Sequence, residues 1–214
     1  MFTRVSSSPY CFRQKNDRSK KLYLSSGIHG NETSGPYTLM RLLEQSDFFR
    51  GIDTTVFPIL NPYGRDHNQR HNENDVDLNR DYKDQKEIET QNHVKLITFD
   101  YDLAICFHEA DEADGAYIYK PNANKNFMVL EKILKAMNAT MSIDSRHKDL
   151  FIEPGIAREV RYKEEHETEA IFLANHGVDA FTIEVPHSLP MYQREATIRA
   201  AITEAINILK SPST

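Results

Sequence analysis

The sequence predicts an α/β fold in which a single domain, residues 1–214, contains a mixed, mostly parallel, twisted sheet with helices on both faces. Three observations predict it. Short apolar runs of strand length alternate with segments of helical periodicity. A chain of 214 residues, 39% hydrophobic and 27% charged, is long enough for one sizeable core and short for two. No repeat or low-complexity tract interrupts the alternation.

The first half of the chain predicts two strands and two helices. The apolar run 22–28 predicts a strand, and Ser34 is a candidate cap for a helix to about residue 45. A second strand, 56–60, ends in the turn Asn61-Pro62-Tyr63-Gly64. The polar stretch 65–84 has no periodicity, and we expect a functional loop there because long structureless loops are uncommon inside compact domains.

The remaining segments continue the alternation. Helices are predicted for 88–97, 127–137, 164–175 and 191–209, and strands for 101–107, 116–119 and 180–185. In sheets of this kind, binding sites lie at the carboxyl ends of the strands.

The composition limits the classes of binding partner that we expect. A formal net charge of −6 without a basic block argues against nucleic acid or an anionic membrane and favours a small soluble substrate. The N-terminus lacks the apolar core of a signal peptide, and no run approaches the roughly 20 apolar residues of a membrane span. Two cysteines, Cys11 in a polar segment and Cys106 in an apolar run, suit a reducing compartment, so we expect a cytoplasmic protein. The oligomeric state stays open.

Two histidines and a glutamate follow predicted strands. His29-Gly30-Asn31-Glu32 comes after the first strand, where a glycine-flanked turn can aim an imidazole and a carboxylate at one zinc ion. His108 ends the third strand and would complete a His, Glu, His set with one position open for water, as in catalytic zinc sites. The alternatives are an ordinary surface pair at His29 and Glu32 and a backbone-bonded histidine at His108.

Glu184 lies near the end of the last predicted strand, among Phe181, Ile183 and Val185. Burying an unpaired carboxylate there would cost several kcal/mol. We therefore interpret Glu184 as a general base for the metal-activated water, which passes the proton to a leaving amine. The alternative is an edge-strand glutamate that faces solvent.

Together these motifs resemble the zinc metallocarboxypeptidase superfamily, which includes carboxypeptidase A-like peptidases, murein peptide amidases and the succinylglutamate desuccinylase/aspartoacylase group. The resemblance spans about residues 20–190 and rests on the order and approximate spacing of five motifs. They are His29-Gly30-Asn31-Glu32, Asn61-Pro62-Tyr63-Gly64, Asp77-Leu78-Asn79-Arg80-Asp81-Tyr82, His108 and Ile183-Glu184.

The resemblance implies catalytic or ligand roles for four of these residues. It implies that His29, Glu32 and His108 bind one zinc ion and that Glu184 is the general acid/base.

It also implies substrate contacts. Asn79 and Arg80 are similar to the pair that holds the terminal carboxylate of the substrate, and Arg70 to the arginine that stabilises the oxyanion. Tyr162, which lies 184 − 162 = 22 positions before Glu184, corresponds in approximate place to a substrate-binding tyrosine. The alternative interpretation, from the residues alone, is that Arg70 and Arg80 are solvated surface charges and that Tyr162 packs on a neighbouring arginine.

The sequence departs from the superfamily pattern at two positions. Tyr63 replaces the aspartate common in Asn-Pro-Asp-Gly, and Asp75 replaces the glycine usual before Val-Asp-Leu-Asn-Arg. We expect both changes to affect loop geometry more than zinc binding. His67, His71 and Asp75 provide enough donors nearby to allow a second ion.

These observations favour a small metallocarboxypeptidase that acts on a peptide with a free C-terminal carboxylate. The 30 residues after Glu184 leave little room for the β-rich C-terminal domain of the deacylases, and the Asn-Pro-x-Gly turn also favours peptidases. The alternatives are an N-acyl amino acid deacylase and a catalytically silent binding module. Glu169, 15 positions before Glu184, is expected to be an exposed helix charge, and would otherwise select a cationic terminal residue.

Overall fold

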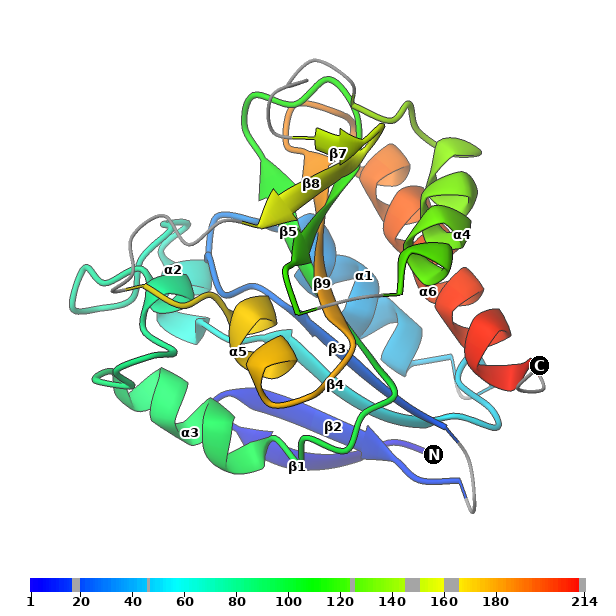
Figure 1. Ribbon diagram of the computed structural model, residues 1–214. Coiled ribbons are helices and arrows are strands. Elements are labelled where there is room, and N and C mark those ends of the chain that lie inside the picture. The colour runs from blue at the N-terminus through cyan, green and yellow to red at the C-terminus, as the bar shows by residue number, and fades with distance from the viewer. Residues whose placement is uncertain (17–19, 46, 124–125, 145–150, 160–165, 212–214) are drawn as a thin grey trace.

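The computed structural model describes residues 1–16, 20–45, 47–123, 126–144, 151–159 and 166–211 (Figure 1). Within these residues, the strands form one nine-stranded sheet in the order β1-β2-β4-β3-β5-β9-β6-β8-β7. The central strands are parallel neighbours: β4 (Asp53–Ile59), β3 (Lys21–Ser26), β5 (Leu103–Ala110) and β9 (Ala180–Pro186).

The outer strands make the sheet mixed. A hairpin of β1 (Thr3–Ser7) and β2 (Tyr10–Gln14) pairs antiparallel to β4. On the other side, β6 (Tyr117–Pro121) runs antiparallel to β9, β8 (Ile156–Glu159) parallel to β6, and β7 (Phe151–Glu153) antiparallel to β8.

Helices cover both faces of the central strands (Figure 1). One face carries α1 (Ser34–Leu43), α4 (Phe127–Asn138) and α6 (Met191–Lys210), and the other carries α3 (Ile88–Leu96) and α5 (Glu169–Asn175). The short α2 (Pro62–Asp66) and a 3-10 turn (Leu78–Arg80) lie in the predicted functional loop region. The predicted fold class is therefore confirmed. No helix in the described part of the chain is both long and apolar enough to cross a membrane.

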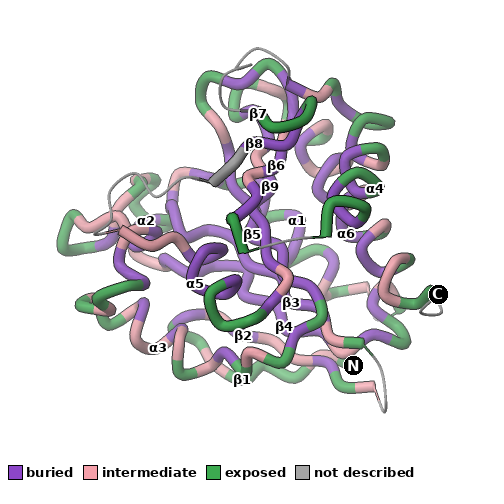
Figure 2. Tube along the Cα trace, viewed as in Figure 1, coloured by how far each residue is buried: buried purple, intermediate pink, exposed green. Residues whose placement is uncertain are grey.

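Alternation along the central strands divides the core between the two faces. On β3, Leu22 and Leu24 pack with the apolar side chains of α1 and α6, whereas Tyr23 packs with the cluster that includes α5. Figure 2 shows these central strands buried along their length. Because both faces are covered, a polar side chain is accessible mainly where a central strand ends.

Three local predictions were incomplete. The β1–β2 hairpin was not predicted, and it places Cys11 in the core with no exposed surface. The predicted turn at residue 61 is the start of α2, with Asn61 as its N-cap. Helix α5 begins at Glu169, later than the predicted residue 164, which lies outside the described residues.

Candidate metal centre

The turn after β3 carries His29 and Glu32 and packs directly against α2. A Cβ atom at Gly30 would lie 1.9 Å from the carbonyl carbon of Gly64, so only glycine fits at that contact. Asn61 holds the start of α2 in place by accepting the Gly64 N–H at 2.8 Å. The backbone of this motif therefore fixes the turn from which the two predicted ligands project.

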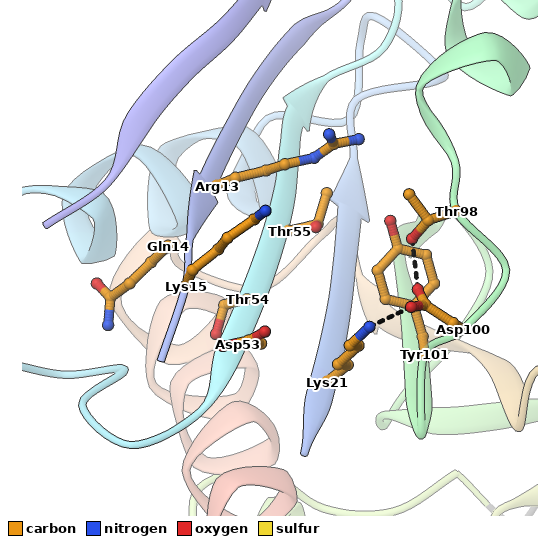
Figure 3. Close-up of a pocket in the computed structure, with 10 residues that line it drawn as sticks. All are labelled: Arg13, Gln14, Lys15, Lys21, Asp53, Thr54, Thr55, Thr98, Asp100 and Tyr101. Carbon is orange, nitrogen blue, oxygen red and sulfur yellow. Dashed lines mark hydrogen bonds and ion pairs between the residues drawn. The ribbon is translucent and has the colours of Figure 1, made fainter. Parts of the chain in front are cut away.

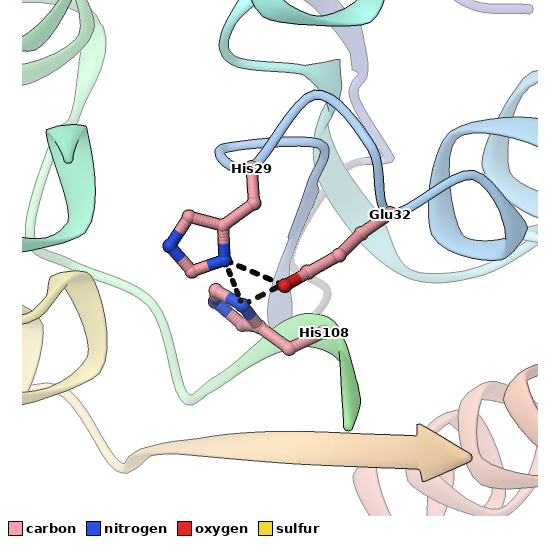
Figure 4. Close-up of side chains that lie close together, drawn as sticks. All are labelled: His29, Glu32 and His108. Carbon is pink, nitrogen blue, oxygen red and sulfur yellow. Dashed lines mark hydrogen bonds and ion pairs between the residues drawn. The ribbon is translucent and has the colours of Figure 1, made fainter. Parts of the chain in front are cut away.

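The structure brings the three predicted ligands together (Figure 4). His29 Nδ1 lies 2.6 Å from Glu32 Oε1, and His108 Nδ1 lies 3.2 Å from His29 Nδ1 and 3.1 Å from Glu32 Oε2. All three side chains are buried. His29 and Glu32 lie in the turn after β3, and His108 lies near the end of β5, the adjacent parallel strand, as expected for a site at the carboxyl ends of the strands.

The donor set fits a tetrahedral zinc ion. Bonds of about 2.0 to 2.1 Å would separate neighbouring ligand atoms by about 3.3 Å, close to the spacing of the two Nδ1 atoms. Glu32 Oε2 is buried, and its contact with His108 Nδ1 at 3.1 Å does not have the geometry of a hydrogen bond, so a cation would satisfy it. Two imidazoles and a carboxylate are typical zinc ligands.

The donors considered for a second ion do not converge. His71 Nδ1 lies 2.8 Å from Asp75 Oδ1, whereas His67 Nδ1 bonds to the Tyr63 carbonyl at 2.9 Å. Among the residues that the structure describes, His29, Glu32 and His108 form the one group of three or more such donors able to share an ion.

Mutual attraction within the cluster shifts its pKa values. Burial alone would raise the pKa of Glu32, but the His108 and His29 imidazoles outweigh it and hold that pKa well below its usual range. Burial alone would lower the pKa of His108, yet the nearby carboxylates, Glu32 foremost and then Glu184, raise it to about 9. The carboxylates thus favour a positive charge at this point.

Asp77, to which the sequence analysis assigned no role, contacts the cluster. Its Oδ1 lies 3.1 Å from His29 Nε2, and its Oδ2 accepts from Arg70 Nη2 at 2.9 Å. A carboxylate on the far nitrogen of a ligand histidine orients the ring and fixes its tautomer. Arg70 Nη1 also lies 3.9 Å from Glu32 Oε1, so the predicted oxyanion residue is adjacent to the ligands. The sequence did contain a signal for Asp77, because this residue lies in the same motif as Asn79.

Asn79 is buried behind the ligands. Its Oδ1 accepts the backbone N–H of Glu169 at 2.9 Å, and its Nδ2 lies 3.5 Å from His108 Nε2. Arg80 is half-buried, and its Nη1 donates to the Asn79 carbonyl at 2.8 Å. Of the two predicted carboxylate-binding residues, Asn79 therefore packs against the cluster, and Arg80 contacts Asn79.

The expectation that Glu169 is an exposed charge was wrong. Its side chain is 1% exposed and accepts a hydrogen bond from Tyr23 Oη at 2.5 Å. Burial raises the pKa of Glu169. Tyr23 in turn contacts His93, so Glu169 is part of an internal polar network.

Glu184 lies on β9 directly opposite His108 in the strand register, and Tyr117 of β6 pairs with it on the other side. It is half-buried on an interior strand of the sheet, so the edge-strand alternative does not hold. Burial and the Glu184 carboxylate both raise the pKa of Tyr117. Tyr162 lies outside the described residues.

A separate cavity of about 200 Å³ lies at the amino-terminal ends of β3 and β4 (Figure 3). Lys21, Asp53 and Tyr101 are among the residues that line it. Since the candidate ligands His29 and Glu32 follow the carboxyl end of β3, this cavity is at the opposite end of that strand and contributes nothing to the cluster.

Comparisons with known proteins identify the family and the fold. The family model of the succinylglutamate desuccinylase/aspartoacylase catalytic domain matches residues 18–209. Among curated proteins, none matches the sequence.

Several solved structures share the fold. A candidate metallopeptidase from Shewanella amazonensis SB2B is 20% identical, with 100% of this chain and 88% of that chain covered and a TM-score of 0.80. One from Shewanella denitrificans OS217 is 18% identical, with 98% and 84% covered and a TM-score of 0.80. A metallo-carboxypeptidase from Pseudomonas aeruginosa, in complex with (2-guanidinoethylmercapto)succinic acid, is 16% identical, with 97% and 64% covered and a TM-score of 0.76.

Proposed function

The chain belongs to the succinylglutamate desuccinylase/aspartoacylase catalytic domain family, and we propose that it is a zinc-dependent hydrolase of an amide bond next to a free carboxylate. The first candidate is a metallocarboxypeptidase that acts on small peptides. The second is a deacylase of N-acyl amino acids.

One observation carries the proposal: the convergence of His29, Glu32 and His108 beside Glu184. The ligand atoms of the first three lie within 4.8 Å of one another, and Glu184 is opposite His108 across the β5–β9 pair. A structural zinc site would be closed by a fourth protein ligand, whereas a catalytic site keeps one position for water. Three ligands and a neighbouring carboxylate support the catalytic arrangement.

Each of the proposed site residues has its own role in amide hydrolysis. A zinc ion held by His29, Glu32 and His108 would supply Lewis-acid activation of water and of an amide carbonyl. Glu184 takes a proton from the attacking water and returns it to the leaving amine as the carbon–nitrogen bond breaks. Arg70 stabilises the negative charge that develops on the carbonyl oxygen. Arg80, and Asn79 beside it, hold the substrate carboxylate, and a bidentate contact to the guanidinium fixes the amide in place.

Different observations favour the two candidates. Similarity over 84% and 88% of the length of two Shewanella candidate metallopeptidases favours the peptidase. The family match over residues 18–209 favours the deacylase. Both reactions break an amide whose nitrogen belongs to an amino acid with a free α-carboxylate, so the proposed residue roles are the same for both.

A substrate panel distinguishes the candidates. Zinc-loaded protein would be incubated with short peptides and with N-acetyl and N-succinyl amino acids, and released amino acids would be quantified by mass spectrometry. A peptidase releases the C-terminal residue of peptides, and a deacylase cleaves only the acyl amino acids. A chelator-treated sample and the Glu184→Gln variant control for contaminating hydrolases.

The same panel tests the third alternative. A protein that binds zinc at His29, Glu32 and His108 but hydrolyses no member of a broad panel would be a silent binding module, and the hydrolase proposal would be wrong.

A further inference from the structure

Glu109 is a buried carboxylate that immediately follows the ligand His108 on β5. Because side chains alternate along a strand, Glu109 projects to the opposite face of the sheet from His108, where its side chain is 1% exposed. A buried carboxylate without partners would cost several kcal/mol. Glu109 accepts from three donors on three other segments of the chain, at Ser34, His187 and Arg194.

The first donor connects Glu109 with the other ligand turn. Glu109 Oε1 accepts the backbone N–H of Ser34, the first residue of α1, at 2.5 Å. The N-cap residue Thr33 provides no side-chain cap, so Glu109 supplies both the missing acceptor and the negative charge that a helix N-terminus favours. Ser34 lies two residues after Glu32. One carboxylate therefore links the strand of His108 to the turn of Glu32.

The other two donors connect Glu109 with the strand of Glu184. Glu109 Oε2 accepts from His187 Nδ1 and from Arg194 Nη1, each at 2.6 Å. His187 comes three residues after Glu184, and its backbone N–H also bonds to the Ala110 carbonyl at 2.9 Å. Arg194 is in the first turns of α6, which packs against α1 (Figure 1).

We propose that Glu109 is a positioning residue of the metal centre, which sets Glu32 and Glu184 relative to His108 without contacting ion or substrate. The inference rests on the proposed function, because it requires that the cluster binds zinc. Charge-assisted hydrogen bonds are stronger than neutral ones, and the three donors come from the segments that begin α1, end β9 and begin α6. Loss of a residue that orients metal ligands typically weakens metal binding about 10- to 100-fold.

Glu109→Gln is the direct test. A carboxylate accepts hydrogen bonds on both sides, but an amide accepts on one and donates on the other. Whichever way the amide is oriented, its NH₂ group faces another hydrogen-bond donor. That donor is either the backbone N–H of Ser34 or the side chains of His187 and Arg194. We expect zinc affinity, measured by competition with a chromophoric chelator, to fall about 10- to 100-fold. The visible absorption of the cobalt-substituted protein, which reports ligand geometry, should change as well.

Two further variants separate positioning from general stability. Thr197→Val removes a part-buried hydrogen bond from α6 to Thr140, which follows α4, and no candidate ligand takes part in this bond, so the variant should lower the melting temperature without changing zinc affinity. Glu109→Gln combined with Arg194→Met removes the unpaired guanidinium, so the fold should recover while zinc binding stays weak.

The outcomes are distinct. If wild-type protein does not bind zinc, the proposed function fails and this inference fails with it. If wild-type protein binds zinc and both Glu109 variants bind it within twofold with an unchanged cobalt spectrum, the positioning role is wrong and the proposed function stands.

Discussion

At the scale of single residues, the proposed ligand His29 is oriented by a second carboxylate. His29 has a carboxylate, Asp77, on its far nitrogen, and that carboxylate is itself held by Arg70. Burial alone would raise the pKa of Asp77, but His29 and Arg70 hold it far below its usual range, so Asp77 stays ionised. An ionised partner makes the imidazole a better donor to a metal ion.

Asp77→Asn should therefore weaken zinc binding. The amide has one acceptor oxygen where the carboxylate has two, so either the contact to His29 or the contact to Arg70 is lost. We expect the zinc dissociation constant, measured by chelator competition, to rise about 10- to 100-fold. Asp75→Asn is the matched control, since its side chain is 94% exposed on the same loop and contacts no ligand. Equal affinities for the two variants would contradict the role of Asp77.

Glu184→Gln should preserve zinc binding and the fold while turnover falls at least about a hundredfold, because an amide cannot accept the proton of the attacking water. Zinc content, circular dichroism and kcat would be measured on the same preparation. The matched control is Glu195→Gln, which removes a surface ion pair with Arg41 and should leave kcat unchanged. Near wild-type turnover in zinc-loaded Glu184→Gln protein would exclude Glu184 from the mechanism.

His93 predicts a pH dependence of stability. It is 1% exposed between Tyr23 and Tyr82, and burial lowers its pKa to about 3. The unfolded chain binds a proton to this histidine below about pH 6.5, and the folded chain does not until about pH 3. The free energy of unfolding therefore decreases by about 1.4 kcal/mol for each unit by which the pH is lowered within this window.

The measurement compares urea unfolding of wild type and His93→Gln at pH 7 and pH 5. The variant has no group at this position that titrates, so wild type should lose about 2 kcal/mol more than the variant across the interval. Equal losses would mean that His93 titrates normally in the folded protein.

At the scale of elements, periodicity predicted the segments with strong patterns. Strands β3, β4, β5 and β9 are apolar runs buried on both faces, and the amphipathic α1, α4 and α6 lie close to their predicted bounds. The β1–β2 hairpin was missed because β1 is mostly exposed and polar, so its conformation depends on pairing with residues distant in sequence. The short β7 and β8 were missed because three or four residues carry no clear periodicity, so their conformation depends on pairing with each other and with β6.

One element-level contact depends on a single glycine. Gly30→Ala would place a Cβ atom 1.9 Å from the Gly64 backbone, and neither the ligand turn nor α2 can move away without displacing His29 or Asn61. We expect a loss of at least about 2 kcal/mol in unfolding free energy, together with weaker zinc binding. Both would be followed by urea denaturation and chelator competition.

Gly177→Ala is the matched control. A Cβ there meets nothing within 4 Å, and the cost is limited to the left-handed backbone, φ +88°, at about 1 kcal/mol. Zinc affinity should not change. If Gly30→Ala were no more costly than this control, the close packing of the two backbones would not be what fixes the ligand turn.

At the scale of the whole molecule, the sequence predicted which residues of the candidate site converge, but not all of the contacts around them. The convergence of His29, Glu32 and His108 was predictable because each lies at or near the end of an apolar strand, and parallel strand ends meet at one edge. Asp75 is in the left-handed region at φ +59°, which gives a physical reason for the glycine usual at that position. The burial of Glu169 and the contacts of Glu109 were not predictable, since their partners come from other elements.

The charge of the whole molecule makes a local cation necessary for the proposed substrate. The net charge of −6 repels an anionic substrate at long range, so a substrate carboxylate needs a nearby guanidinium, and Arg80 contacts Asn79, which packs against the cluster. A bidentate, charge-assisted contact contributes about 1.5 to 3 kcal/mol and fixes the amide over the metal. Amidating the substrate carboxylate and changing Arg80→Ala should each lower kcat/KM about 10- to 100-fold.

Because both changes remove the same contact, combining them should add little further loss, and kcat/KM measured for all four combinations forms a double-mutant cycle. The matched control is Arg65→Ala, an exposed arginine on α2, which should leave the preference for free carboxylate intact. If the wild-type enzyme hydrolysed free and amidated substrates equally, Arg80 would have another role. The requirement for a carboxylate next to the scissile amide would then be wrong for both candidate functions.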